Sequence, residues 1–249
     1  MRLITCFYLQ RLIHFGGRSS KADMINDNFP TPHNLLTPLQ RAFIQVFSQL
    51  PDQQHFYLTG GTALAEYYLG HRLSYDLDFF TVNDGLVQPV SYQIQKLCKE
   101  NNLKLDIIRR FATFVEFLVS DENETLKVDL ALDSPFRFQG TIITAQGIWV
   151  NNFVDLCVDK LLAYYGRAEP RDAVDLYFIV NHAAPDVLIE RAKQKDPGFD
   201  LYWFAVALNR GIHFPDEPKD WPVSMLVDWD PQMIKQLFTA WAIEIMESL

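Results

Sequence analysis

Cysteine is scarce in this sequence, and long apolar runs are missing. Three cysteines, Cys6, Cys98 and Cys157, occur in 249 residues, and no two of them form a CxxC pair. This usage argues against a disulfide framework and predicts a protein of the reducing cytoplasm. No run reaches the roughly 18 apolar residues that a membrane span requires, so we expect no membrane partner.

Basic side chains are outnumbered by acidic ones. Lys and Arg contribute 22 positive charges against 31 negative charges from Asp and Glu, which gives a formal net charge of −9. A surface that is basic overall, as in a general nucleic-acid binder, is therefore excluded. The residues that can still form a local basic face are Lys104, Arg109, Arg110, Lys127 and Arg137.

The sequence lacks the patterns of two common kinds of enzyme site, the zinc site and the serine-hydrolase site. The histidines lack the spacing of zinc ligands, and His71 is expected at the surface. No G-x-S-x-G motif is present, so acyl hydrolysis has no support. Hydrophobic residues make up 49% of the chain and charged residues 21%, which is typical of an ordinary globular protein.

The amino-terminal residues form the least regular part of the sequence. A short apolar run begins after Arg2, but Gln10 and Arg11 interrupt it and no small-x-small cleavage site follows, so we expect no secretory signal. Met24 opens a polar segment typical of an ordinary start. We therefore expect residues 1–30 to be a poorly ordered extension, and the start at Met24 raises the hypothesis that residues 1–23 lie upstream of the natural start codon.

The rest of the chain divides by its apolar periodicity. Spacings of three and four predict helices over 38–50 and throughout the region after residue 153, whereas alternation predicts strands. The predicted strands are 55–58, 74–80, 104–109, 113–119 and 126–132. We therefore expect an α/β domain over 31–150 and a helical domain over 151–249.

A glycine pair follows the first predicted strand. Gly60-Gly61-Thr62 lies where this strand ends and a helix begins. Paired glycines let the backbone approach a ligand closely, and the N–H groups at a helix start favour phosphate. Thr62 can add a hydroxyl donor. Taken alone, the motif is more typical of an ordinary tight turn.

Two nearby aspartates favour a ligand-binding role for this motif over an ordinary turn. Asp76 and Asp78 are two residues apart on a predicted strand, so their carboxylates point to one face with Cα atoms roughly 6–7 Å apart. Two such charges repel unless a cation lies between them, and hard oxygen ligands suit Mg²⁺ or Mn²⁺. Two solvent-facing aspartates would be an equal alternative if the glycine motif were not so close in sequence.

A third carboxylate is expected from a neighbouring strand. Asp129 lies in the middle of the predicted strand 126–132, which makes it the first choice over Asp106 and Asp133. Three carboxylates can hold two divalent ions that stabilise the attacking and leaving oxygens of phosphoryl transfer. The predicted metal ligands are thus Asp76, Asp78 and Asp129.

These residues resemble the signature of the DNA polymerase β-like nucleotidyltransferase superfamily, and in finer detail the AbiEii/AbiGii type of nucleotidyltransferase toxin. The resemblance spans residues 40–182. Its first block consists of Gly60, Gly61, Thr62, Leu64, Arg72, Ser74, Asp76 and Asp78. Its second block consists of Lys160, Arg167, Arg171, Asp172 and Asp175.

The residues of the second block can also be interpreted without the family resemblance. Lys160 lies on a helix with apolar periodicity, where a cation can face a triphosphate or simply form a solvated pair with Asp159. Asp172 lies in a first helical turn, where an acid stabilises the helix dipole. The resemblance favours a functional role for Lys160 and, one turn deeper in the helix, for Asp175.

The resemblance implies a mixed sheet flanked by helices, with a helical carboxyl-terminal region. It implies Mg²⁺-dependent (or Mn²⁺-dependent) transfer of NMP from an NTP to an acceptor hydroxyl, with Asp129 or Asp175 helping to deprotonate that hydroxyl. The residues expected to bind the nucleotide are Gly60, Gly61, Thr62, Arg72, Ser74 and Lys160. The expected biological role is a type IV toxin that acts on an RNA such as tRNA, or on a protein, with a cognate antitoxin.

Two other functions remain open at this point. The acidic balance suits a cationic acceptor, so one alternative is a small-molecule nucleotidyltransferase of the aminoglycoside type. A catalytically inactive binding protein is the other alternative, but the intact Gly60-Gly61-Thr62 and both acids of the Asp76–Asp78 pair argue against it.

Overall fold

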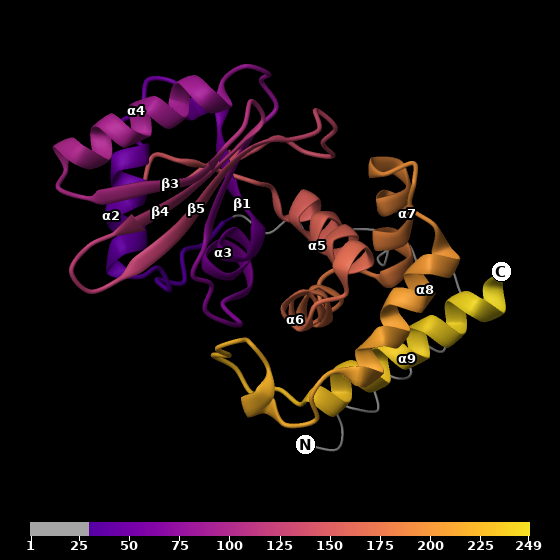
Figure 1. Ribbon diagram of the computed structural model, residues 1–249. Helices are drawn as coiled ribbons and strands as arrows, with labels where there is room; N and C mark the ends of the chain where they lie inside the picture. Colours follow the sequence, from indigo (N-terminus) through magenta and orange to yellow (C-terminus); the bar gives the residue numbers. More distant parts are fainter. Residues whose placement is uncertain (1–29) are drawn as a thin grey trace. The chain divides into compact units, whose positions relative to one another are not determined.

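The computed structural model describes residues 30–249, which fall into two compact units (Figure 1). The sheet unit comprises residues 30–156 together with Ser224–Val227, and the helical unit comprises Cys157–Val223 with Asp228–Leu249. The expected extension over residues 1–30 lies outside the described residues, apart from Pro30. Nothing in the sequence indicated that Ser224–Val227 belongs with the sheet.

One mixed sheet forms the centre of the sheet unit. Within residues 30–249 it has seven strands in the order β3-β4-β5-β2-β1-β7-β6. β2 runs parallel to β5 and β1 parallel to β7, while the other neighbours are antiparallel. The strands are β1 (Tyr57–Thr59), β2 (Leu77–Thr81), β3 (Lys104–Arg110), β4 (Phe114–Ser120), β5 (Thr125–Leu132), β6 (Ile142–Ile143) and β7 (Trp149–Val150). This sheet, with its flanking helices, confirms the predicted α/β fold class.

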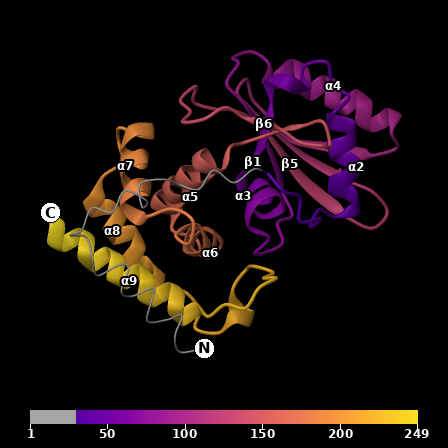
Figure 2. The same cartoon turned by 180° about the vertical axis from the view of Figure 1, so that it is seen from behind.

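Two helices cover one face of the sheet (Figures 1 and 2). The central strands bury every second residue, such as Phe117 on β4, because alternate side chains point to this face. α2 (Pro38–Phe47) and α4 (Val87–Glu100) pack there. The rings of Phe47 and Phe79 stack with centroids 3.8 Å apart, which joins α2 to β2. The opposite face of the central strands is less buried.

The start of α2 is fixed by a capping box. The backbone N–H of Gln40 donates to the hydroxyl of Thr37 at 3.2 Å, and the backbone N–H of Thr37 donates to Oε1 of Gln40 at 2.9 Å. The Gln40 amide also donates to the carbonyl of Ser74 at 2.9 Å. The helix therefore holds the segment that precedes β2.

A short helix follows β1. α3 (Gly60–Leu64) continues as one π-helical turn, Ala65–Leu69, which ends at Gly70 with φ +60°. The predicted strand 74–80 was wrong at its beginning, because β2 starts at Leu77 and Asp76 directly precedes it. Residues 73–76 form the loop that precedes β2, and its backbone accepts or donates hydrogen bonds at Leu73 and Ser74.

The helical unit has an aromatic core. The ring of Phe204 meets Trp241 edge-on at 5.2 Å, and the ring of Tyr164 meets Phe238 at 5.0 Å. No helix among residues 30–249 is long and apolar enough to cross a bilayer. The helices are α5 (Phe153–Arg167), which begins at the end of the sheet unit, α6 (Pro170–Ile179), α7 (Pro185–Lys195), α8 (Leu201–Arg210) and α9 (Pro231–Ser248).

Candidate active site

A row of polar residues crosses the less buried face of the sheet. Glu116 on β4 is the register partner of Asp129 on β5, Asp129 is the partner of Asp78 on β2, and Asp78 is the partner of Thr59 on β1. Residues directly opposite one another in neighbouring strands point to the same face. Three carboxylates therefore stand side by side on adjacent strands.

Asp76 lies on the same side as Asp78. The chain alternates regularly here, with Leu77 and Phe79 fully buried and both aspartates half-buried. The hydroxyl of Thr62 donates to the backbone carbonyl of Asp76. The predicted donor of the glycine motif thus holds the segment that carries the first aspartate.

Asp78, Arg72 and Ser74, which are predicted site residues, pack against the glycine turn. Gly60 has φ +72°, and a Cβ atom there would overlap the carboxylate of Asp78. A Cβ atom on Gly61 would lie 2.6 Å from Nη2 of Arg72 and 2.9 Å from Oγ of Ser74. Only glycine fits both positions, because the side chains of the loop and of β2 occupy the space. The structure therefore brings together the first block of predicted site residues.

A distant segment fastens the loop that carries Arg72 and Ser74. Within the sheet unit, the N–H of Leu73 donates to the carbonyl of Ser224 at 2.8 Å, and the N–H of Leu226 donates to the carbonyl of His71 at 2.9 Å. Arg72 and Met225 form the antiparallel bridge between these bonds. The expectation of a surface position for His71 was wrong. His71 is 1% exposed, in a loop that is paired with the segment around Met225.

Asp129 is the acid with the most unusual environment. Its Oδ2 accepts a hydrogen bond from Nζ of Lys127 at 2.7 Å, while its buried Oδ1 has no hydrogen-bond partner among residues 30–249. Burial raises the pKa of the Asp129 carboxyl, and the charges of Glu116 and Asp76 add to this effect against the opposing Lys127.

The pKa of Lys127 is shifted by the same group of charges. Burial acts to lower the pKa of its ammonium group, but the hydrogen bond to Asp129 and the charges of Asp129, Asp76 and Asp78 outweigh it, so the pKa is raised. The four side chains therefore share one electrostatic environment.

The two competitors for the third carboxylate lie elsewhere. Asp106 is on the edge strand β3, half exposed, with Lys104 at 3.2 Å. Asp133 follows β5 and accepts a hydrogen bond from the hydroxyl of Tyr57. Asp129 is the acid that lies next to Asp78.

A divalent cation fits this donor set only in part. In the described chain no cluster of three His, Cys, Asp or Glu side chains is arranged to enclose a metal ion. The carboxylates of Asp76, Asp78 and Asp129 supply hard oxygen donors. The Oδ1 atom of Asp129, which has no hydrogen-bond partner within the described part of the chain, is the atom that a cation would satisfy. The chemistry of the donors fits Mg²⁺ or Mn²⁺, with Lys127 on the remaining oxygen of Asp129.

The second predicted block is an ion-pair network inside the helical unit. Nζ of Lys160 lies 2.7 Å from Oδ2 of Asp175 and 3.5 Å from Oδ1 of Asp172. Arg167 donates to both carboxylate oxygens of Asp172. Both aspartates are fully buried, and the side chain of Lys160 is 8% exposed. The structure thus pairs Lys160 with Asp175, the two residues of this block for which the resemblance favours a functional role.

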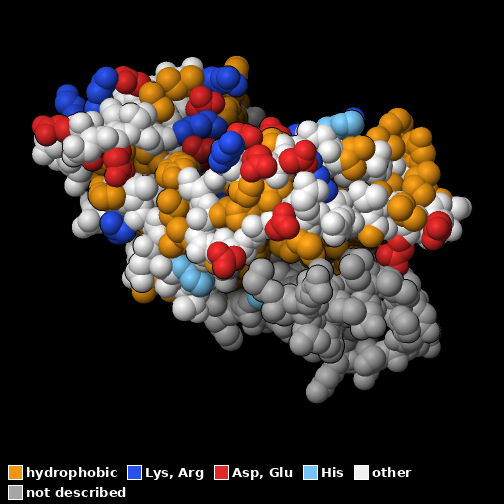
Figure 3. Space-filling view, turned by 90° about the horizontal axis from the view of Figure 1, so that it is seen from below, with side chains coloured by type: hydrophobic (Ala, Val, Ile, Leu, Met, Phe, Trp, Pro, Cys, Tyr) orange, Lys and Arg blue, Asp and Glu red, His pale blue; other side chains and the backbone are white. Residues whose placement is uncertain are grey.

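The predicted basic face does not consist of unengaged cations. Lys104 contacts Asp106, Arg109 lies 3.9 Å from Glu116, and Lys127 bonds to Asp129. On the face shown in Figure 3, Lys and Arg side chains are interspersed with Asp and Glu side chains.

Sequence reasoning missed Glu116 and Asn151. Glu116 stands in the middle of an alternating strand, as Asp129 does, so the same argument would have found it. Asn151 gave no such signal, because it follows a strand of two residues, and its neighbours come from β1.

Comparisons with known proteins identify a family for this chain. The family model described as "Nucleotidyl transferase AbiEii toxin, Type IV TA system" matches residues 41–198. A comparison with curated proteins gives no significant match.

Two solved structures from Helicobacter pylori share the fold. A candidate nucleotidyltransferase is 18% identical with a TM-score of 0.55, and the alignment covers 85% of this chain and 93% of that one. JHP933 is 18% identical with a TM-score of 0.50, and the alignment covers 85% of this chain and 90% of that one. The family match extends over most of the chain and confirms the resemblance seen in the two sequence blocks. The chain belongs to the AbiEii family of nucleotidyltransferase toxins from type IV toxin–antitoxin systems.

Proposed function

We propose that the sheet unit binds an NTP together with Mg²⁺ or Mn²⁺ and transfers the nucleotidyl group to a hydroxyl of an RNA such as tRNA. The observation that supports this most directly is the position of Asp78. Its carboxylate lies against Gly60 on one side and is the register partner of Asp129 on the other. A phosphate-binding turn and a pair of carboxylates thus meet at one residue.

In this proposal Asp76, Asp78 and Asp129 hold the divalent cation, which when bound would neutralise charge on the phosphoryl oxygens. The turn at Gly60 and Gly61 offers backbone N–H groups to the phosphates, since neither residue has a side chain of its own. Arg72 and Ser74 border this turn and complete the phosphate site.

The reaction is a displacement at the α-phosphorus. The acceptor oxygen forms a bond to that phosphorus, the bond to the β-phosphate oxygen breaks, and pyrophosphate leaves. The acceptor proton passes to a carboxylate of the row, for which Asp129 is our choice. Asp175 is fully buried against Lys160, so we assign it the task of positioning that lysine.

Labelled nucleotides test this function. Each NTP carrying a labelled α-phosphate is incubated with total RNA, with total protein or with aminoglycosides, in the presence of Mg²⁺. We expect label in RNA from the wild type and none from Asp78→Asn. Asp106→Asn is the matched control, because that acid lies on the same sheet beside Lys104 and away from the row. Label in protein or aminoglycoside alone would identify a different acceptor.

Salt provides a second criterion for an RNA acceptor. An acidic protein binds RNA through a few local cations, and the affinity falls steeply as salt rises. Labelling of RNA should therefore decline with salt more steeply than labelling of a small neutral acceptor. Growth arrest on expression, relieved by a neighbouring gene, would support the toxin role and a cognate antitoxin.

A further inference from the structure

The row of polar residues continues beyond Thr59 to a cluster that the proposed mechanism does not use. β7 pairs with β1, and the N–H of Asn151 donates to the carbonyl of Leu58 at 2.8 Å. The Asn151 amide donates to Oγ1 of Thr59 at 3.1 Å, so it lies on the same face as Asp78. Two strand spacings, about 10 Å, separate Asn151 from Asp78.

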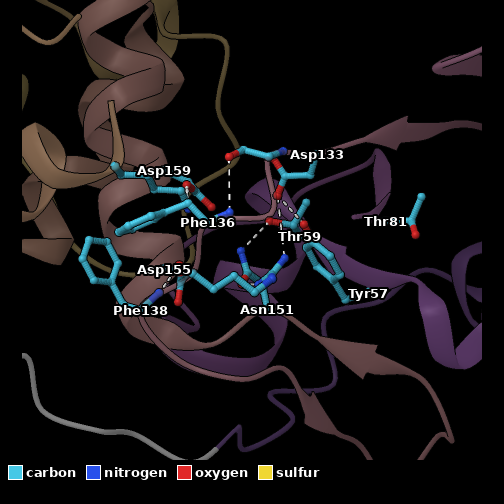
Figure 4. Close-up of polar contacts among 12 residues, drawn as sticks. Tyr57, Thr59, Thr81, Asp133, Phe136, Phe138, Asn151, Asp155 and Asp159 are labelled. Atoms are coloured by element: carbon cyan, nitrogen blue, oxygen red, sulfur yellow. Dashed lines mark hydrogen bonds and ion pairs between the residues drawn. The ribbon is translucent and has the colours of Figure 1, made fainter. Parts of the chain in front are cut away.

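Asn151 holds the guanidinium of Arg137. Nη1 of Arg137 donates to Oδ1 of Asn151 at 2.7 Å, and Cζ lies 3.8 Å from the centre of the Tyr57 ring. The hydroxyl of the same Tyr57 donates a hydrogen bond to the carboxylate of Asp133. Figure 4 shows Tyr57, Thr59, Asp133 and Asn151 gathered around one point.

The segment that carries Arg137 is fixed at both ends. The N–H of Asp133 donates to the carbonyl of Thr81 at 2.7 Å. The fully buried carboxylate of Asp155 accepts hydrogen bonds from the backbone N–H groups of Phe138 at 3.2 Å and Gln139 at 3.0 Å. The guanidinium is therefore preorganised, and a ligand would not have to order it.

One edge of this guanidinium is left unsatisfied. Nη2 of Arg137 is buried without a hydrogen-bond partner in residues 30–249, and Oδ2 of Asp133 lies 3.7 Å away, beyond hydrogen-bond distance. A buried donor without a partner is costly, and an anionic oxygen would satisfy it. At the other side of Asp78, Oδ1 of Asp129 is a buried acceptor with no hydrogen-bond partner among the residues that the structure describes. One face thus needs a cation at Asp129 and an anion at Arg137.

We propose that Arg137 binds the phosphates of the NTP distal to the α-phosphorus, a role that rests on the proposed function. Transfer places the α-phosphorus at the carboxylates, and Asn151, which holds Arg137, lies about 10 Å from Asp78 on the same face of the sheet. The planar fork of arginine matches phosphate oxygens, and stacking on Tyr57 leaves its edge available. Arg137 therefore binds the group that departs as pyrophosphate.

Deletion of phosphates from the ligand tests this assignment. Binding of inorganic pyrophosphate, and of the NTP, NDP and NMP of the best-incorporated base, is measured by calorimetry with Mg²⁺ for the wild type and Arg137→Ala. We expect Arg137→Ala to weaken NTP and pyrophosphate binding by about 10- to 100-fold and to leave NMP binding unchanged. Arg137→Lys should recover part of this affinity, because the charge remains but the fork is lost.

Arg110→Ala is the matched control. The guanidinium of Arg110 lies 4.0 Å from the centre of the Tyr92 ring, in the same stacking arrangement but on the edge strand β3. This variant should bind all four ligands as the wild type does. Thermal unfolding of every variant reports any loss of the fold.

Two results would overturn the assignment. Pyrophosphate binding that is unchanged in Arg137→Ala would show that the residue does not contact these phosphates. An equal loss for NTP and NMP would show that Arg137 only clamps its loop. Nucleotidyl transfer by the wild type is measured in parallel, so an active wild type with either result leaves the proposed function intact and removes only Arg137.

Discussion

Two aspartates, one in each unit, differ in how completely they are paired. Asp129 in the sheet unit has Lys127 on one oxygen and no partner among the described residues on the other. Asp172 in the helical unit has Arg167 on both oxygens and Lys160 nearby. Both lie in motifs that the sequence singled out.

This difference separates a ligand site from a structural site. A buried charge that is fully paired is stable as it stands, whereas a half-paired carboxylate beside further acids has a reason to bind a cation. We therefore expect the acids of the sheet unit to matter for chemistry and those of the helical unit to matter for folding.

The largest expected effect is on the stability of the helical unit. Asp175→Asn removes the nearer carboxylate from the buried ammonium of Lys160 and leaves it only Asp172, which is shared with Arg167. This change should cost about 3–5 kcal/mol of unfolding free energy. Denaturant unfolding measures this loss. The double variant Lys160→Met with Asp175→Asn should recover most of it. A stable Asp175→Asn protein without transferase activity would instead give the pair a direct catalytic role.

The counterpart in the sheet unit should change activity and spare stability. Asp78→Asn removes a proposed metal ligand and should raise the barrier by about 3 kcal/mol or more, a loss of at least 100-fold in rate. Its unfolding free energy should stay equal or rise, because repulsion between neighbouring carboxylates falls. Incorporation of labelled nucleotide and denaturant unfolding are the two measurements. Activity close to that of the wild type would contradict the proposed site.

Glycine substitutions separate backbone strain from ligand geometry. Gly60→Ala and Gly85→Ala both place a side chain at positive φ, which should cost roughly 1–2 kcal/mol of stability in each case. A Cβ atom on Gly60 would also displace the carboxylate of Asp78, whereas none of residues 30–249 has an atom within 4 Å of a Cβ atom on Gly85. Only Gly60→Ala should therefore lose activity. Equal activity losses in the two variants would show that strain alone is responsible.

The smallest effect is a difference in pH dependence. The pKa of Asp129 is raised in the folded protein by burial, so its ionised form opposes folding. Asp129→Asn should therefore be slightly more stable than the wild type at neutral pH. That advantage should vanish as the pH falls through the raised pKa and below the ordinary value of 3.8.

The pKa of Asp216 is shifted in the opposite direction, so the pH dependence of its contribution to stability has the opposite sign. Hydrogen bonds from Lys235 and Gln232 lower the pKa of its carboxyl, so its contribution to stability is present above the ordinary value of 3.8 and is lost as the pH falls through the lowered pKa. Asp216→Asn should therefore be less stable than the wild type at neutral pH, with the gap closing in acid. Unfolding free energies measured across pH test both variants. The same sign in both would contradict the burial of Asp129.

Much of the sheet could be predicted from local pattern. The alternation in 113–119 and 126–132 follows from burial of one face, and it correctly predicted β4 and β5. The beginning of β2 could not be predicted, because Arg72 and Leu73 meet Ser224–Val227 from far along the chain. Such a pairing has no local signal.

By itself the sequence determined the fold class, the family and the closeness of Asp76 and Asp78 to the glycine turn, because these depend on periodicity and on residues near one another in the chain. Tertiary structure alone decided that Glu116 and Asp129 stand beside Asp78, that Lys160 is enclosed by Asp172 and Asp175, and that Arg137 lies on Tyr57. These arrangements depend on strand order, register and helix packing, which bring distant residues into contact and which no local spacing encodes.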